Sequence, residues 1–540
     1  VLVVFVWMGV SALQNHRAWL VNGSLRTYSF KLDDKPYSLR PGERKSTKLK
    51  LGEHILEYPE GVYVEFNYSI SLVKQILEHN LLVINPDAMA LLSLEDSGQS
   101  TTNRHSHSHQ IHVLPDVSQL LFNFKKQDSM EEQEAERLVL HRPQTHLEMI
   151  ELFDSLGLDM AKKPYARRAL SMEHSTPNAA QLLDIAFAGS DVAEARKFLR
   201  KGLAHSPALM PWHLHYQDLV INSEMEHDLV AEYTERFKQH PDEPENPYLL
   251  GRIIENRDVA QKFFEQSEKG KGMQGLGYEA IANDLFTTGE FKKALGFSQK
   301  ALNKTPDSER FMQLHEHILL ALRKYDDLVA HARTWQSMEP EKDLSRKIVL
   351  YLTCAGYHRE AEAEAVTLSE ERQVPLPSLN AVRFYAVGNM KDYLQCLAET
   401  GDPHAKLEEL LLYHRTTDAD RILETITHSY WEHLVLYCSA MSEDLSELAE
   451  SNLEMALKKL GRETHEQRTL ADYLTSSTPP DPESIKQLKI SAKEKALLCT
   501  VLGIRFPEHR NTFHEMASRY NFSYEYPYFL IKHWIQSPKK

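Results

Sequence analysis

Four histidines in a short polar stretch are the residues whose spacing best suits metal chemistry. His105, His107 and His109 alternate with serine, and His112 follows shortly after. Alternate residues of an extended chain project from one face, so three imidazoles would come within reach of a shared Zn²⁺ or Ni²⁺ ion. No cysteine or carboxylate completes a tetrahedral ligand set, which favours a histidine-rich loop over a metal site. We therefore predict that the protein holds no metal and no other cofactor.

Signatures of other chemistries are also missing. The sequence contains no G-x-x-x-x-G-K-[ST] phosphate loop, no H-E-x-x-H zinc motif and no G-x-S-x-G nucleophile elbow. The nearest approach is the His-Glu-His triplet His315–His317. Residues two apart on a helix point to different faces, so this pair of histidines cannot share one metal ion there, and we expect the triplet to face solvent. The sequence therefore predicts a protein that is not an enzyme.

The composition is that of a globular protein with more than one folding unit. Of the 540 residues, 42% are hydrophobic and 26% are charged, and domains usually contain about 100–200 residues. The formal net charge of −15 argues against nucleic acid as a partner, because binding of phosphates requires clustered Lys and Arg. The cysteines are far apart and predict buried free thiols: Cys354, Cys396, Cys438 and Cys499.

The first residues form an apolar run, Val1–Leu13, that carries no charge. A membrane-spanning helix needs about 20 residues, so we expect the sequence to begin inside a single-pass transmembrane anchor, residues 1–14. His16, Arg17 and Trp19 suit a boundary at the lipid headgroups. A signal-peptide core and a buried N-terminal strand are the alternatives.

Residues 15–140 have the alternation of half-buried strands. Tyr28, Phe30 and Leu32 alternate with polar residues, and a period of two places such a set on one face of a strand. A second set alternates in the same way: Val62, Val64, Phe66 and Tyr68. Turn-forming residues separate the strands at Asn22-Gly23, Asp33-Asp34, Pro41-Gly42, Gly52 and Pro59–Gly61. The region is predicted to be a small antiparallel β-sandwich or barrel.

The stretch Phe30–Tyr58 resembles a PEGA-type β-module. Such modules contain a Pro-Gly turn followed by an L-x-x-G-x-H sequence, and here Leu49–His54 reads L-K-L-G-E-H. The stretch departs from the family at Asp33-Asp34, where a glycine is usual. The resemblance implies a bacterial, envelope-associated adaptor with its soluble part on the extracytoplasmic side. It supplies no catalytic residue.

Five cations surround the Pro-Gly turn of this stretch: Arg40, Arg44, Lys45, Lys48 and Lys50. One interpretation is contact with anionic lipid beside the anchor, worth about 1 kcal/mol per cation. The other, which we favour, is a solvated hairpin tip whose charge is diluted by Glu43 and Glu53.

Residues 141–400 change to a helical pattern with regularly spaced prolines. Successive prolines at the ends of predicted helix pairs, Pro207, Pro241, Pro306, Pro340 and Pro375, are separated by 34, 65, 34 and 35 residues. The sequence resembles tetratricopeptide repeats, pairs of antiparallel helices with a period of about 34 residues. The resemblance implies an α-solenoid.

The clearest unit is residues 275–305. Its predicted first helix buries Tyr278, Ile281, Ala282 and Leu285, Gly289 forms the turn, and Ala294 and Ala301 allow close packing of the second helix. Two further units repeat this scheme, with Leu182, Leu183, Ala186, Gly189 and Ala195, and with Val349, Leu350, Gly356 and Ala361. The unit before Pro340 diverges, with Glu316 and Leu328 at the small positions.

Residues 401–540 continue as divergent helical repeats and end in aromatic residues. A loop at Ser476–Pro482 precedes one more predicted helix pair. The aromatic residues after it are predicted to cap the solenoid rather than to form a ligand cage: Tyr520, Phe522, Tyr524, Tyr526, Tyr528, Phe529 and Trp534.

Together these patterns predict an α+β multidomain protein: a truncated transmembrane helix, a β-module and a C-terminal α-solenoid. Its expected function is that of a membrane-anchored scaffold whose concave face binds proteins or peptides. Asn283, on a predicted first helix, is the one residue that we expect to contact a partner, because its amide offers both a donor and an acceptor. The alternatives are an accessory subunit or metal-dependent enzyme, with catalysis in preceding sequence or at the histidines, and a structural envelope protein.

Overall fold

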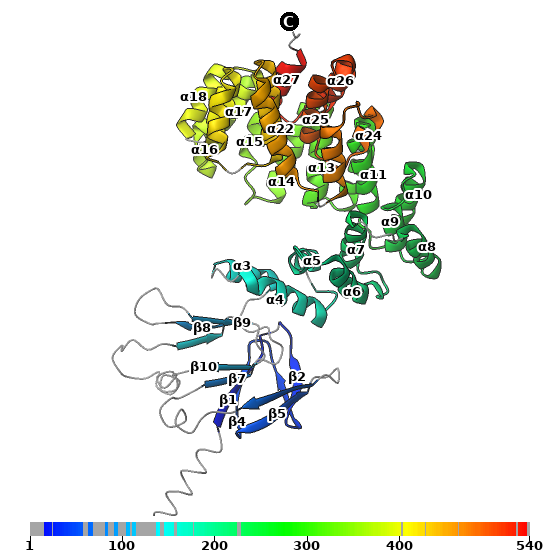
Figure 1. Cartoon of the computed structure of the whole chain (residues 1–540), viewed down its shortest axis with the longest axis vertical. Helices are drawn as coiled ribbons and strands as arrows, with labels where there is room; N and C mark the ends of the chain where they lie inside the picture. The colour runs from blue at the N-terminus through cyan, green and yellow to red at the C-terminus, as the bar shows by residue number, and fades with distance from the viewer. Residues whose placement is uncertain are drawn as a thin grey trace, which may run out of the picture. The chain divides into compact units, whose positions relative to one another are not determined.

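The computed structural model forms two compact units, residues 1–219 and 220–540, here called the N-terminal and C-terminal units (Figure 1). It describes residues 16–23, 25–57, 63–68, 81–84, 91–95, 104–107, 111–114, 137–140, 145–155, 159–176, 178–223, 228–400, 403–426, 428–462, 464–524 and 527–536. The predicted anchor, residues 1–14, lies outside these ranges. Within them, no helix combines the length and the hydropathy that crossing a membrane requires.

Eleven short strands are described in the N-terminal unit. They are β1 His16–Val21, β2 Tyr28–Leu32, β3 Lys35–Leu39, β4 Arg44–Leu49, β5 Gly52–Glu57, β6 Tyr63–Tyr68, β7 Leu81–Ile84, β8 Leu91–Glu95, β9 Arg104–His107, β10 Ile111–Leu114 and β11 Arg137–Leu140. Three sheets have the strand orders β3-β2-β5-β6, β10-β7-β1-β4 and β11-β8-β9. The prediction of purely antiparallel pairing is wrong at one place, because β1 and β7 pair in parallel.

The strand alternation and the aspartate turn of the β-module follow directly from the sequence. Tyr28, Phe30 and Leu32 are buried while the residues between them are exposed. Asp33 and Asp34 have φ angles of 51° and 63°, the left-handed conformation of a tight hairpin turn. The Asp33 carboxylate accepts a hydrogen bond from the backbone N–H of Ile55 and lies 2.6 Å from Nδ1 of His54. These contacts connect the turn to β5.

The helices form antiparallel pairs along the rest of the chain. In the N-terminal unit they are α3 His146–Ser155, α4 Asp159–Met172, α5 Ala179–Phe187 and α6 Val192–Leu203, and α7 Met210–Asn222 contains the division between the units. The C-terminal unit continues with α8 Leu229–Gln239, α9 Glu245–Gly251, α10 Arg257–Ser267, α11 Leu276–Thr287, α12 Phe291–Lys304, α13 Glu309–Ala321, α14 Tyr325–Met338, α15 Ser345–Cys354, α16 His358–Arg372, α17 Leu376–Val387, α18 Met390–Thr400, α19 Pro403–Leu412 and α20 Thr416–Leu423. Its last helices are α21 Tyr430–Ser442, α22 Ser446–Leu460, α23 His465–Thr475, α24 Pro482–Gln487, α25 Ala492–Arg505, α26 Arg510–Tyr520 and α27 Tyr528–Gln536.

The predicted helix pair at residues 275–305 is confirmed as α11 and α12. Ile281 and Ala282 are buried on the first helix, and Ala294 and Ala301 on the second. Gly289 has a φ of 82° in the turn between them, where a side chain would be strained. The other two predicted units correspond to α5–α6 and α15–α16, with buried Leu182, Leu183, Ala186, Ala195, Val349 and Ala361.

Polar contacts recur at the spacing of one helix pair. Glu279 contacts Arg310, and Glu316 contacts Lys347, each 31 residues later. Asn452 donates to Asp420, 32 residues earlier. Regular stacking therefore continues beyond residue 400, where the sequence has no clear period.

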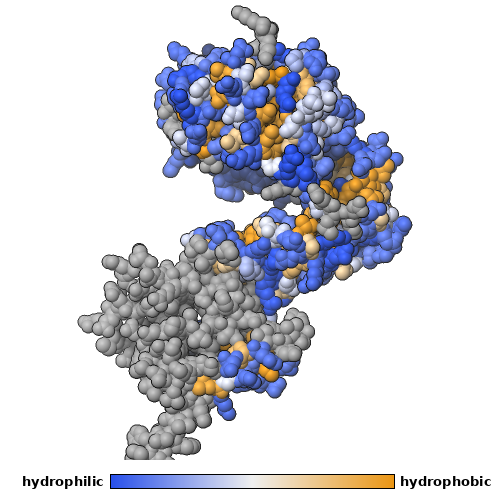
Figure 2. Space-filling model, in the orientation of Figure 1, coloured by the Kyte–Doolittle hydropathy of each residue, from blue (hydrophilic) through white to orange (hydrophobic). Residues whose placement is uncertain are grey.

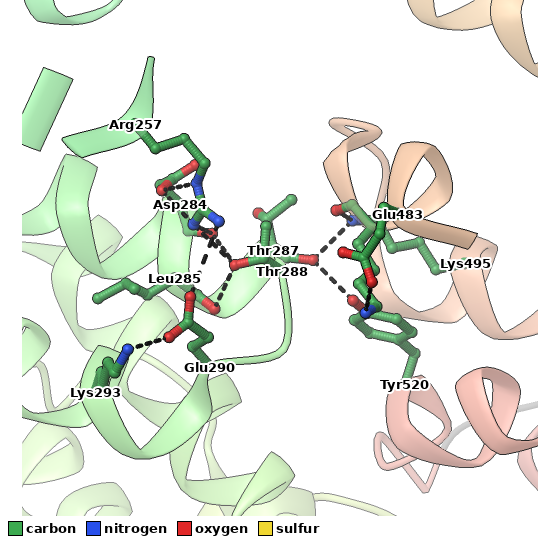
Figure 3. A network of polar contacts seen from close by, with 11 residues as sticks. Arg257, Asp284, Leu285, Thr287, Thr288, Glu290, Lys293, Glu483, Lys495 and Tyr520 are labelled. Atoms are coloured by element: carbon green, nitrogen blue, oxygen red, sulfur yellow. Dashed lines mark hydrogen bonds and ion pairs between the residues drawn. The ribbon is translucent and has the colours of Figure 1, made fainter. Parts of the chain in front are cut away.

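The C-terminal helices do not simply extend the stack. Helix α25 lies against α21, and its Lys495 contacts Thr287 at the end of α11 (Figure 3). Phe522 belongs to the same hydrophobic core as Phe311, Leu319 and Trp335 of helices α13 and α14. Phe522 thus packs against earlier repeats, whereas Trp534 lies in a core with residues of α25 and α26, and Tyr526 lies outside the described residues. Hydrophilic side chains cover most of the described helical surface in Figure 2, interrupted by hydrophobic patches.

Close packing in the clearest pair can be tested by enlarging a buried alanine. Replacing Ala294 by Leu should lower the free energy of unfolding by about 1–3 kcal/mol, because helices α11 and α12 would be forced apart. Gly296→Ala is the matched control on the same helix, since a Cβ there meets no atom within 4 Å. Chemical denaturation of both variants checks this, and an unchanged midpoint for Ala294→Leu would place that residue away from the helix contact.

Candidate functional site

The histidines of the predicted metal cluster divide between two sheets. His105 and His107 lie on β9, which pairs with β8. His112 lies on β10, which pairs with β7 in another sheet, and His109 lies outside the described residues. Among the described residues, no group of three or more His, Cys, Asp or Glu is placed to hold a metal ion. The backbone therefore gives no support for a shared ligand set.

The basic turn joins β3 to β4, and because these strands belong to different sheets it is not the hairpin that we favoured. All five predicted lipid-contact residues are exposed: Arg40, Arg44, Lys45, Lys48 and Lys50. The Glu43 carboxylate accepts a hydrogen bond from the backbone N–H of Arg40 at 2.7 Å, so an anion sits within the basic group. Lipid contact here stays a prediction.

The prediction that the triplet His315–His317 faces solvent is wrong for its first two residues. His315 and Glu316 are buried, whereas His317 is exposed. Helix α13 is covered from two sides, because His315 lies 2.9 Å from Ser298 on α12 and Glu316 contacts α15. Burial lowers the pKa of His315 to about 4, so this imidazole is neutral at physiological pH.

Buried carboxylates link consecutive first helices of the pairs. Glu279 on α11 accepts two hydrogen bonds from Arg310 on α13, at 2.9 and 2.6 Å. Glu316 on α13 accepts from Lys347 on α15 at 2.8 Å and from Tyr351. Both carboxylates are buried, whereas the Arg310 side chain is 59% exposed. Burial raises the pKa of Glu279 and the Arg310 guanidinium opposes this shift. These pairs hold the stack together and present their cations toward solvent.

Asn283, the predicted partner contact, lies on the same helix face as the first of these pairs. It is exposed on α11, four residues after Glu279, and residues four apart lie one above the other on a helix. The structure therefore places Asn283 on an accessible stripe of the first helices. Its contact with a partner stays a prediction.

The carbonyl of Thr287, at the end of α11, joins the repeats to the C-terminal helices (Figure 3). Lys495 Nζ on α25 donates to this carbonyl at 2.8 Å and to the carbonyl of Lys486 at 2.6 Å. The hydroxyl of Tyr520 donates to the Thr287 carbonyl at 3.0 Å. Lys495 is only 1% exposed, and burial lowers its pKa to about 8. A buried lysine with a lowered pKa suits catalysis in principle, but the ammonium of Lys495 already donates hydrogen bonds to two backbone carbonyls.

A charged cleft of about 560 Å³ lies on the other side of the same turn, lined by residues of α10–α12. Arg257 Nε donates to Asp284 at 2.8 Å, and Glu290 pairs with Lys293 (Figure 3). Lys292 and Lys300 complete the lining. Because the principal charges neutralise one another, the cleft has no clear preference for an anion or a cation.

A glycine-rich stretch that the sequence reasoning missed, Gly270–Gly275, has the spacing G-x-G-x-x-G. In dinucleotide-binding folds this motif follows a strand and leaves the helix N-terminus free for phosphate. Here it follows α10 and precedes α11, and the Glu268 carboxylate already accepts from the N–H groups of Gly275 and Gly277, at 3.2 and 2.8 Å. The chain's own carboxylate thus occupies the place of a phosphate.

The residues after α26 cross the turns of successive helix pairs in order. We call residues 521–524 and 527–533 the aromatic segment. We call the residues that it meets at the ends of first helices and in the turns after them the turn edge: Phe286, Phe291, Tyr325, Cys354, Tyr385, Gly388 and His414.

The contacts along the turn edge are mainly aromatic. Phe522 lies 5.9 Å from Phe286, between ring centroids. The hydroxyls of Tyr524 and Tyr325 are 2.7 Å apart, and the ring of Phe529 lies 4.7 Å from that of Tyr385. The residues after α26 therefore lie across several helix pairs, first as the short non-helical stretch 521–524 and then in helix α27.

A buried acid lies beneath the aromatic segment. Glu408 on α19 accepts a hydrogen bond from the Tyr393 hydroxyl at 2.7 Å. Its second oxygen and the hydroxyl of Tyr385 are buried without a hydrogen bond of normal geometry, although Tyr385 faces both Glu408 and the backbone of Phe529. Burial raises the pKa of Glu408 to about 7, so its protonation changes near neutral pH.

The raised pKa of Glu408 predicts a specific dependence of stability on pH. The folded protein favours protonated Glu408, so its contribution is fully present below pH ~4.5 and is lost as the pH rises through ~7. Between pH 5 and 8, the free energy of unfolding should fall by about 2–3 kcal/mol more for the wild type than for Glu408→Gln. Denaturant titrations of both proteins check this, with the neighbouring Glu409→Gln as the control. Parallel pH curves for wild type and Glu408→Gln would contradict it.

No protein-family model matches the sequence, and no curated protein is significantly similar to it.

Proposed function

We propose that the protein is an interaction scaffold in which stacked helix pairs, similar to tetratricopeptide repeats, hold extended segments of protein partners. The observation that carries this proposal is the aromatic segment itself. It lies across successive turns through ring contacts and a hydroxyl pair, from Phe522 at α11–α12 to His533 beside His414. A stack that accommodates this segment of its own chain along its turns has the geometry to accommodate a segment of a partner.

We call the accessible polar residues Asn283, Arg310 and Lys347 of the first helices the first-helix stripe. This stripe supplies polar groups for such a partner. Arg310 is more than half exposed and Lys347 is 40% exposed, while buried Glu279 and Glu316 hold both in place. Asn283, exposed on α11 four residues after Glu279, adds a donor and an acceptor. Oriented cations of this kind suit a carboxylate or a backbone carbonyl.

An accessory subunit or an enzyme is the alternative, and the described residues favour it less. Lys495 and Glu408 have pKa values near those of catalytic groups. Both are almost completely buried among packed helices, and each is bonded to the chain itself. These contacts favour structural roles for both groups.

The scaffold proposal predicts an effect of Asn283→Ala on partner capture. Partners enriched by the tagged wild-type chain should be depleted with this variant, while the free energy of unfolding stays within about 0.5 kcal/mol because the residue is exposed. Asn303→Ala, at an exposed position on the second helix of the same pair, is the matched control. Quantitative mass spectrometry with cross-linking maps the contacts. Equal capture by all three proteins would remove Asn283 from the binding surface.

We also propose, from the sequence alone, that the apolar run Val1–Leu13 attaches the protein to a bacterial membrane, with the remainder on the extracytoplasmic side. The full-length protein should then stay in the membrane fraction during high-salt and carbonate washing, because an inserted helix is not released by screening of charges. Fractionation and immunoblotting check this. Release by salt alone would leave only the basic turn as a possible membrane contact.

A further inference from the structure

The turn edge carries more apolar surface than the aromatic segment covers. Tyr357, Val387 and Tyr413 are 44%, 52% and 59% exposed, respectively. They lie in or beside the turns of three consecutive pairs: Val387 and Tyr413 directly precede the positive-φ residues Gly388 and His414, whereas Tyr357 directly follows Gly356. Exposed large hydrophobic residues thus recur at these turns, and recurrent exposed apolar groups are typical of interaction sites.

The aromatic segment contacts the turn edge at three separate places. Phe522 packs against Phe286 and Phe291, the hydroxyl of Tyr524 meets that of Tyr325, and Phe529 packs against Tyr385. Each place contacts one ring, so the spacing of the aromatic residues in a segment determines whether the segment fits the turn edge.

Gly388 lies beside the third ring. Its φ of 74° is a left-handed conformation, which favours glycine, and a Cβ there would meet Cε1 of Phe529 at 3.6 Å, an ordinary contact distance. The turn after α17 therefore presents backbone without a side chain to the ring.

We propose that the turn edge is a docking surface for partner segments that place aromatic residues as Phe522, Tyr524 and Phe529 are placed here, and that the aromatic segment occupies this surface in cis until a partner displaces it. The inference rests on the proposed scaffold function and specifies the chemistry of the partner. The cis segment has the advantage of a high effective concentration. A partner offsets this by also burying the exposed Tyr357, Val387 and Tyr413.

Other residues of α27 hold this helix in place, so its contacts with the turn edge can be removed without unfolding the chain. Leu530, Ile531 and Trp534 are buried in the core formed with α25 and α26. Tyr524 and Phe529 are only partly buried. The double variant Tyr524→Ala/Phe529→Ala therefore removes two contacts with the turn edge and leaves the anchoring of α27 intact.

The test uses a fluorescein-labelled peptide with the sequence of residues 519–530 and the full chain. Its affinity for the double variant should exceed that for the wild type by at least about tenfold, because the apparent affinity scales with the fraction of open surface. Phe237→Ala is the matched control, since Phe237 is a partly buried aromatic residue on α8 that packs against Phe263. It should bind the peptide as weakly as the wild type. Fluorescence anisotropy measures all three.

A peptide with alanine at the positions of Phe522, Tyr524 and Phe529 should not bind the double variant. This arm compares two peptides on the same protein variant, so it does not rest on a comparison between variants. Equal affinities for wild type and double variant, or equal binding of the alanine peptide, would overturn the inference. Circular dichroism confirms that the variants are folded.

The outcomes separate this inference from the scaffold proposal. If partners are captured through the first-helix stripe but the peptide does not bind the double variant, the scaffold proposal stands and the aromatic docking surface is contradicted. Selective peptide binding without any captured partner would support the surface and count against the scaffold.

Discussion

One backbone carbonyl holds the C-terminal helices against the repeats. The carbonyl of Thr287 accepts hydrogen bonds from the ammonium of Lys495 and from the hydroxyl of Tyr520 (Figure 3). Removing a lysine from water is costly unless its N–H groups find acceptors, and here the carbonyls of Thr287 and Lys486 provide them. The junction fixes the end of α26 beside α11, and the chain that follows can only continue along the neighbouring turns. The position of the aromatic segment is thus a consequence of this junction.

The stack itself depends on two kinds of contact between helices. Small residues such as Ala282 and Ala294 allow the helices to approach closely, and buried acid–base pairs such as Glu279–Arg310 connect each first helix to the next. Breaking such a pair leaves a charge buried without a partner, which costs more than the pair itself contributes. The same pairs hold cations at the surface in fixed positions. Stability and the capacity to bind therefore come from the same residues.

The sequence predicted the local elements well, because their signals are local. Alternation predicted β2, the spacing of prolines predicted α11–α12, and small residues marked their contacts. The burial of Glu316 was missed because a helix covered on two sides loses its polar face, although the recurrence of acid and base 31 residues apart was a usable signal. The contact of Tyr520 with Thr287 spans 233 residues, and no local pattern encodes it. The polar contacts beneath Phe529 were missed for the same reason.

Hydrogen–deuterium exchange of the full chain, with and without a partner bound, tests the central claim most directly. The claim is that the repeats hold extended segments and that the aromatic segment occupies their turn edge. It predicts that amides of residues 521–524 and 527–533 are protected in the free chain and lose protection when a partner binds, while helices α11–α19 stay protected. Rapid exchange of the aromatic segment in the free chain, or unchanged protection with a partner bound, would contradict it.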